Sequence, residues 1–327
     1  MTKNVGKCGP LRVGVIGVGY HGQHHARLFS QLPNVMLVGV MDVDLGQLER
    51  IADQFDTKPY PELDPLLRDV HAVSIAVPTT FHLEIARQCL EAGVHVLVEK
   101  PLALTSQEGR TLADLAKKHD RILQVGHIER FNPVWQDNRT SIRSPSFIET
   151  HRLSPFPNRG TDVDVVRDLM IHDLDLLLSL ELGAIQSVQA VGMAFASSHV
   201  DCAHATIQFE RNCTANLTAN RISGNRIRRF AVLQQDACIE MDFHTRRSVI
   251  TRRSQGQDNQ FSSTSEEKQS EYLEPLKLQL EAFLDSVNHR TPPMVSGHEG
   301  TACMELAEHI LEAMVCREDA RTLLTSY

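Results

Sequence analysis

The sequence predicts an α/β protein of two domains, a doubly wound parallel sheet followed by an α+β domain with an open, mostly antiparallel sheet. The 327 residues are enough for two hydrophobic cores and exceed one ordinary small domain. Up to about Val125, short apolar runs alternate with helical stretches, which is typical of a parallel sheet. After about Gly126, extended segments joined by short polar turns follow one another, which is typical of an antiparallel sheet. We expect domains over residues 1–125 and 126–327.

In the first domain, the apolar runs predict the strands Leu11–Ile16, Val35–Met41, Val70–Val77, Val94–Val98 and Arg121–Val125. The stretches between them predict helices, among them Leu45–Phe55, Phe81–Ala92 and Ser106–His119. Thr105 precedes the last of these, with Glu108 in its first turn, which is a capping arrangement. Because the crossovers are helical, the strands should run parallel.

In the second domain, the extended segments are Phe147–Leu153, Ile185–Phe195, Ala203–Phe209, Cys213–Asn220, Arg228–Gln234, Ala237–Phe243 and Ser248–Thr251. Helices over Val163–Leu180, Leu276–Val287 and Thr301–Cys316 should cover one face of this sheet. The other face needs cover, which a second subunit could supply. Residues Arg253–Ser270 are polar and aperiodic, so we expect a solvent-exposed loop there.

Composition and charge exclude several classes of partner. A formal net charge of -8 and a pI near 6.0 argue against a broad nucleic-acid footprint. The lysines near Met1 precede no apolar segment, and no stretch approaches the ~18 apolar residues that span a bilayer. The 7 cysteines stand singly and are interpreted as buried thiols of a reducing compartment. We expect a cytoplasmic protein with no nucleic-acid and no membrane partner.

A glycine-rich turn, Gly17-Val18-Gly19-Tyr20-His21-Gly22, follows the first predicted strand and precedes a helical pattern. The first two glycines allow a tight turn and a close approach of backbone to a pyrophosphate, and the third lets helix and strand pack closely. The second strand ends at Asp42, about where the acid that binds an adenosine ribose is expected. Val43 and Asp44 offer no cation to a ribose 2′-phosphate. The predicted cofactor is NAD, not NADP.

Two further segments follow strand ends. Pro78–His82 should line the cofactor, although Thr79 or Thr80 is equally suited to cap a helix. Glu99-Lys100-Pro101 brings a carboxylate and a cation to the edge where ligands of open α/β sheets bind. A plain surface pair is the alternative, and the sequence leaves the isomer of Pro101 open. The predicted cofactor-binding residues are Gly17, Gly19, Tyr20, His21, Gly22, Asp42, Pro78, Thr79, His82, Glu99 and Lys100.

Asp168 and His172 are four residues apart in a predicted helix, so they share one face, with Asp175 on the neighbouring strip. Carboxylates placed in this way can orient an imidazole. The leucines around them imply burial, which makes an unpaired polar group costly. A satisfied core histidine is the alternative. A metal is not expected, because no third ligand motif is evident and NAD chemistry needs none.

Other polar clusters are less specific. His21, His24 and His25 could share a metal, but a phosphate turn and the start of a helix explain them better. Loop arginines beside aromatic residues can hold phosphates, with solvated surface charge as the alternative. The predicted substrate-binding residues are His127, Arg130, Asn132, Arg152, Arg159, Asp168 and His172.

In chain order, the motifs that carry a family resemblance are the glycine turn, Asp42, Pro78–His82, Glu99-Lys100-Pro101, and Asp168 with His172. Together they resemble the Gfo/Idh/MocA oxidoreductases across nearly the whole chain. The resemblance implies an N-terminal Rossmann domain and a C-terminal sheet that forms the interface of a homo-oligomer, a dimer or a tetramer. It implies that Lys100, Asp168 and His172 are the catalytic group. Met170 departs from the pattern, since many members carry glycine there.

Within the family, Gly126–Pro133 and Asp164–Leu178 resemble the branch that acts on nucleotide sugars, particularly UDP-N-acetylglucosamine 3-dehydrogenases. Such enzymes oxidise a sugar hydroxyl to a ketone, which a partner aminotransferase converts to an amine on the way to a lipid A precursor. In this interpretation His172 is the base and Lys100 stabilises the alkoxide, with Lys100 as the alternative base. A dehydrogenase of a free polyol or simple sugar and a non-catalytic NAD-binding sensor are the rival hypotheses.

Overall fold

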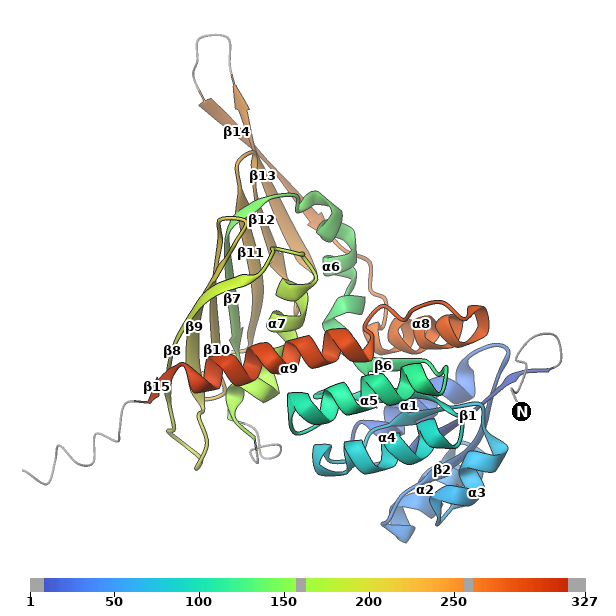
Figure 1. The fold of residues 1–327 in the computed structure, drawn as a ribbon. Helices are drawn as coiled ribbons and strands as arrows, with labels where there is room; N and C mark the ends of the chain where they lie inside the picture. The colour runs from blue at the N-terminus through green and yellow to red at the C-terminus, as the bar shows by residue number, and fades with distance from the viewer. Residues whose placement is uncertain (1–8, 157–162, 256–260, 317–327) are drawn as a thin grey trace, which may run out of the picture. The chain divides into compact units, whose positions relative to one another are not determined.

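The computed structural model describes residues 9–156, 163–255 and 261–316, which form two units (Figure 1). One unit joins the chain up to Ile128 with Glu274–Met304. The other joins Glu129–Leu273 with the chain from Glu305 on. The predicted boundary after residue 125 lies close to Ile128, but the later return of the chain to the first unit was not predicted.

The first unit contains a six-stranded sheet in the order β3-β2-β1-β4-β5-β6. Its strands are β1 (Leu11–Ile16), β2 (Val35–Met41), β3 (Lys58–Tyr60), β4 (Ala72–Ile75), β5 (His95–Glu99) and β6 (Leu123–Gly126). Every neighbouring pair is parallel, which confirms the doubly wound Rossmann topology. The strand order reverses between β1 and β4, where such sheets bind ligands at the carboxyl ends of their strands.

The helices between these strands are α1 (Gly22–Gln31), α2 (Leu45–Gln54), α3 (Leu63–Asp69), α4 (His82–Glu91) and α5 (Ser106–Lys118). A 3₁₀ turn over Thr79–Phe81 precedes α4. The predicted cap of α5 is confirmed, because Thr105 Oγ1 accepts a hydrogen bond from the Glu108 amide at 3.2 Å.

Helix α8 (Pro275–His289) belongs to the first unit. We expected it to cover the second sheet, and that expectation was wrong. Leu280, Phe283 and Val287 are fully buried in one hydrophobic cluster with Leu11 and other residues of β1, α1 and α2. The apolar face of α8 therefore completes the core around the parallel sheet.

Helix α9 (Gly297–Glu312) begins earlier than predicted and ends sooner. Its first turn packs tightly in the first unit, where a Cβ at Gly300 would lie 2.6 Å from Val125. The predicted helical end is instead a short strand, β15 (Met314–Cys316), which pairs with the second sheet.

Among the described residues, the second unit has a nine-stranded sheet in the order β14-β13-β12-β11-β7-β10-β9-β8-β15. The remaining strands are β7 (Pro145–Leu153), β8 (Ile185–Met193), β9 (Cys202–Phe209), β10 (Cys213–Asn220), β11 (Ile227–Gln234), β12 (Ala237–Asp242), β13 (Arg247–Gln255) and β14 (Phe261–Gln269). Only β7 with β10 and β8 with β15 pair in parallel, so the sheet is mostly antiparallel, as predicted. Helices α6 (Pro133–Asn138) and α7 (Ile171–Leu178) accompany it.

The loop predicted over Arg253–Ser270 includes residues 256–260, which lie outside the described residues. In the described part the prediction is wrong, because β13 and β14 form a long antiparallel pair (Figure 1). Polar cross-strand pairs hold it, such as Thr251 Oγ1 with Ser265 Oγ at 2.8 Å and Arg247 with Glu267. The described side chains of β14 are exposed. A strand without a buried face lacks the apolar alternation by which strands are recognised.

The structure shows free thiols at Cys89, Cys202, Cys213, Cys238 and Cys303. Cys89, Cys213 and Cys303 are buried as predicted, whereas Cys202 and Cys238 are only half-buried, which corrects the expectation for these two. No helix within the described ranges is both long and apolar enough to cross a membrane.

Candidate active site

The glycine turn between β1 and α1 is shaped by steric contacts. Gly17 has φ of +81°, and a Cβ there would lie 2.8 Å from the Ala76 carbonyl oxygen. A Cβ at Gly22 would lie 1.7 Å from the Gly17 carbonyl oxygen, whereas one at Gly19 would meet nothing within 4 Å. Gly17 and Gly22 are therefore required by packing, and Gly19 leaves its backbone open to a ligand at the start of α1.

Asp42 lies at the end of β2, beside this turn. Its Oδ2 accepts a hydrogen bond from the Val18 amide at 2.7 Å, and its Oδ1 accepts one from the Asp44 amide at 3.0 Å. A cavity of about 390 Å³ opens there, lined by Ile16, Gly17, Gly19, Met41, Asp42, Val43, Ala76, Val77, Pro78, Phe81 and Ile85. Each carboxylate oxygen keeps capacity to accept a further hydrogen bond, so Asp42 can bind hydroxyl groups in this cavity.

His82 follows the turn that begins at Thr79, but it is buried. Its Nδ1 lies 2.8 Å from the Pro101 carbonyl oxygen, and its Nε2 lies 2.9 Å from that of Val77. Burial lowers the pKa of His82, although the hydrogen bonds to these carbonyls oppose the shift. His82 therefore ties together the segments that follow β4 and β5, and its contact with the cofactor stays a prediction. Pro78 does line the cavity.

Glu99 and Lys100 lie at the carboxyl end of β5, and the Lys100–Pro101 peptide is cis. His25 Nε2 is 3.2 Å from Glu99 Oε1. Burial raises the pKa of Glu99, but the hydrogen bond from His25 and the nearby charges of His25, His21 and Lys100 bring it below its ordinary value. The edge of the sheet thus holds an anion next to Lys100.

The three histidines of the turn diverge. His21 and His24 each form a T-shaped ring pair with Tyr20, with ring centroids 5.2 and 5.7 Å apart. His25 instead lies beneath the turn, between Ser74 and Glu99. Burial lowers the pKa of His21, with Lys100 and the neighbouring histidines adding to the shift and Glu99 opposing it.

In the second unit, Asp168 and His172 are both half-buried. The predicted α-helix is wrong over its first part, because Val166–Met170 forms a π-helical turn that leads into α7. Such turns shift the register of the side chains that follow and are frequent at functional sites. Asp175 does not join His172, since it accepts a hydrogen bond from Arg130 Nε at 2.8 Å.

Arg152 lies in a buried ion cluster, 3.0 and 2.7 Å from the two oxygens of Asp173 and 2.9 Å from Glu129 Oε1. Burial disfavours its charge, but the two carboxylates hold the pKa of Arg152 above its ordinary value. Burial raises the pKa of Asp173 despite Arg152. Arg130 and Arg152 are therefore neither solvated surface charges nor cations held open for a phosphate, because both are paired inside the unit.

The other predicted substrate residues have varied positions. Asn132 caps α6, accepting a hydrogen bond from the Val134 amide at 3.2 Å. His127 is buried, and Arg159 lies outside the described residues. Sequence reasoning missed Glu129 and Asp173, for which the only signal was their acidic type among buried positions. It also missed the pairing of Ser74 with His25, signalled only by a hydroxyl within an apolar strand.

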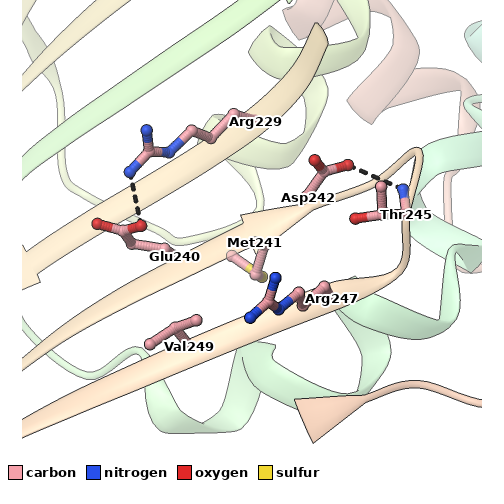
Figure 2. A pocket seen from close by; sticks show the side chains of 7 residues that line it. All are labelled: Arg229, Glu240, Met241, Asp242, Thr245, Arg247 and Val249. Atoms are coloured by element: carbon pink, nitrogen blue, oxygen red, sulfur yellow. Dashed lines mark hydrogen bonds and ion pairs between the residues drawn. The ribbon is translucent and has the colours of Figure 1, made fainter. Parts of the chain in front are cut away.

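Figure 2 shows a groove of about 490 Å³ across β11, β12 and β13, lined by Arg229, Glu240, Met241, Asp242, Thr245, Arg247 and Val249. Arg229 lies 2.6 Å from Glu240, and Arg247 pairs with Glu267. The charges of this groove are balanced by neighbours on the sheet itself, so it lacks the unpaired cations of an anion site.

Comparison with known proteins agrees with this geometry. Residues 11–127 match the model of the oxidoreductase family, NAD-binding Rossmann fold, and residues 158–318 match that of the oxidoreductase family, C-terminal alpha/beta domain. The chain belongs to the Gfo/Idh/MocA oxidoreductase family.

Individual relatives span nearly the whole chain. The UDP-N-acetylglucosamine 3-dehydrogenase of Acidithiobacillus ferrooxidans is 33% identical over 93% of this chain and 97% of its own length. Its solved structure matches with a TM-score of 0.87 over the same shares of the two chains. The scyllo-inositol 2-dehydrogenase (NAD(+)) of Bacillus subtilis is 26% identical over 90% of this chain and 92% of its own length.

As a Gfo/Idh/MocA oxidoreductase, the chain uses NAD, and the residues of the first unit fit that cofactor. Gly19 leaves an open approach for the diphosphate, and Asp42 faces the cavity as an acceptor for ribose hydroxyls. Val43 and Asp44 bring no positive charge to this end. These features agree with NAD rather than NADP.

Proposed function

We propose that this oxidoreductase oxidises the 3-hydroxyl of UDP-N-acetylglucosamine to a ketone. The observation that supports this substrate is the near-complete match, in sequence and in structure, to the Acidithiobacillus 3-dehydrogenase. The product ketone is the kind of compound that an aminotransferase converts to an amine, which would make such an enzyme a functional partner.

In the proposed mechanism, Lys100, Asp168 and His172 are the residues that act on the reacting alcohol. NAD, when bound, accepts the hydride. His172 removes the hydroxyl proton, because an imidazole titrates near neutral pH. Asp168 orients the imidazole, and the Lys100 ammonium stabilises the developing alkoxide. The two candidates for the base, His172 and Lys100, lie in different units of the chain.

The catalytic group is tested by pH profiles of Lys100→Ala and His172→Asn. We expect each variant to lose about 10²–10⁴-fold in kcat, the usual contribution of general acid–base catalysis. A base must be deprotonated to act, so its ionisation produces the fall in activity at low pH. The variant that loses this fall therefore identifies the base. Near-native turnover of both variants at saturating substrate would exclude this group.

The substrate is tested by adding UDP-N-acetylglucosamine to the protein with NAD and following NADH absorbance. Reduction of the product with borodeuteride then places deuterium on the oxidised carbon, which NMR identifies. We expect deuterium at carbon 3. Deuterium at another carbon would refute the assigned position.

A free polyol is the second candidate, because inositol dehydrogenases are among the relatives. Thermal unfolding with NAD present separates the two, since a ligand stabilises the state that binds it. Stabilisation by UDP and UDP-sugars supports the nucleotide sugar. Stabilisation by inositol or glucose alone supports the polyol.

We also propose that the chain forms a homo-oligomer through the outward face of the second sheet. The strand registers place Val191, His204, Thr218, His151 and Arg229 in one row across that face. Two apolar side chains are exposed on this face, Leu233 on β11 and Val191 on β8, each 51% exposed. A mixed surface of this extent suits the same patch on a second copy, as in a two-fold interface.

A further inference from the structure

A buried chain of hydrogen-bonding groups crosses three elements of the first unit. Ser74 Oγ on β4 lies 2.7 Å from His25 Nδ1 on α1. The other ring nitrogen, Nε2, lies 3.2 Å from Glu99 Oε1 at the end of β5. Ser74 is 0% exposed and His25 is 1% exposed. The mechanism above uses neither of these two side chains.

The chemistry of the partners determines the imidazole tautomer. A carboxylate can only accept hydrogen bonds, so the proton of a neutral His25 must be on Nε2. Nδ1 is then an acceptor, and the Ser74 hydroxyl must donate to it. Glu99 therefore selects the neutral tautomer in which His25 donates to it, and the Ser74 hydroxyl satisfies the ring nitrogen that this tautomer leaves as an acceptor.

Glu99 is confined from other sides as well. Gly126 is its partner on β6, and a Cβ there would lie 2.8 Å from Glu99 Oε1. His21 at the start of α1, His82 on α4 and Lys100 next in the chain all interact with its charge. The contacts with His25 and Gly126 thus hold the Glu99 carboxylate in one orientation. Its negative charge contributes to the electrostatic field at Lys100.

We propose that His25 and Ser74 are positioning residues of the dehydrogenase reaction, which hold Glu99 as an oriented anion beside Lys100. This inference rests on the proposed catalytic role of Lys100. The stabilisation of an alkoxide by an ammonium depends on where neighbouring charge is placed before the reaction begins. A merely structural role for the two residues would fasten α1 to the sheet without affecting the ionisation of Glu99.

The test compares the pH dependence of kcat/KM in wild type, Ser74→Ala and His25→Gln. His25→Gln removes the imidazole donor, and Ser74→Ala removes the hydroxyl that holds the ring in place, so in both variants the pKa of Glu99 should rise, because burial is then less opposed. His172, as the proposed base, already sets a first fall in activity below neutral pH, so protonation of the Glu99 anion should add a second, steeper fall at lower pH. This lower part of the acid limb should move to higher pH in both variants. We expect kcat to fall about tenfold, the loss of one charge-assisted hydrogen bond, and KM for NAD to change little.

His95→Gln is the matched control. His95 is also buried in the same sheet, where its Nδ1 accepts a hydrogen bond from the Ile122 amide at 2.9 Å. Its substitution should lower stability and leave the acid limb in place. Ser74→Thr, which restores a hydroxyl, should return the limb towards its wild-type position.

Imidazole nitrogen NMR gives a readout independent of activity. The wild-type signal of His25, assigned by its loss in His25→Gln, should show a proton on Nε2 only. In Ser74→Ala the Nδ1 signal should shift, because that nitrogen loses its hydrogen-bond donor. Ser74→Ala removes only one oxygen atom, so this variant should fold. It therefore still tests the proposal if His25→Gln does not fold. If the acid limb stays in place in both Ser74→Ala and His25→Gln while Lys100→Ala loses turnover, the positioning role is wrong and the catalytic group stands. Unimpaired turnover in Lys100→Ala overturns the catalytic group on which it rests.

Discussion

Gly17, Gly19 and Gly22 belong to one sequence motif, but their surroundings differ. Gly22 has no room for a side chain, Gly17 combines a positive φ with close backbone contacts, and Gly19 faces open space. The motif therefore combines two packing requirements with one position kept clear for a ligand. Substitutions at these glycines should act through different physical causes.

Gly22→Ala should weaken NAD binding by at least about tenfold, because the new Cβ would overlap the Gly17 carbonyl and displace the start of α1. Calorimetric titration with NAD measures the effect. Gly46→Ala is the control, since a Cβ on this exposed position of α2 would meet only Asp44 at 3.4 Å. It should stabilise the protein by roughly 0.5–1 kcal/mol. Equal NAD affinities in the two variants would contradict the steric account.

Asp42→Asn should lower the preference for NAD over NADP by about tenfold or more. The substitution removes the charge that opposes a 2′-phosphate, while its amide oxygen can still accept the hydrogen bond from Val18. The ratio of kcat/KM for the two cofactors measures this preference. An unchanged ratio would show that something other than charge at Asp42 discriminates between the cofactors.

At the scale of elements, α7 is held by ion pairs rather than by leucine packing alone. Asp173 on its first turn pairs with Arg152 of β7, and Asp175 pairs with Arg130. Both arginines were predicted to bind substrate. Since His172 directly precedes Asp173 in the sequence, the ion pairs fix the element that carries the proposed base.

Arg152→Met should destabilise the protein by about 3–5 kcal/mol, because it leaves Asp173 buried without its paired cation and Glu129 with only Arg228, 3.5 Å away. A buried carboxyl with a raised pKa takes up a proton more readily when folded than when unfolded. The deficit should therefore shrink as pH falls through that raised pKa and be largest at neutral pH. Thermal or urea unfolding across pH measures it. An increase in KM for the sugar at unchanged stability would instead favour the predicted phosphate-binding role.

At the scale of the whole molecule, the proposed assembly depends on the outward sheet face. Leu233→Lys should shift the protein towards smaller species, because it buries a charge in the proposed interface. Light scattering coupled to gel filtration measures the mass. Met36→Lys is the control, since Met36 is an exposed apolar residue of the first unit. A wild-type protein that is already monomeric would refute the interface.

The sequence predicted the larger strands of both sheets well, because their buried faces impose an apolar pattern that local reading detects. It missed β3, which has only 3 residues, and it missed β14, whose polar faces carry no such pattern. It also assigned α8 to the wrong sheet. An amphipathic helix shows that it has a buried face but not which core that face joins.

The sequence by itself determined the Rossmann topology, the glycine turn with its acidic partner, and the candidate catalytic residues, because each is a local pattern of residue types at set spacings. Only the tertiary structure decided which charges neutralise one another. It paired Arg152 with Asp173 and Glu129, joined Ser74 through His25 to Glu99, and returned α8 to the first core. These pairings link residues far apart in the chain, and they depend on burial and distance, which exist only once the chain has folded.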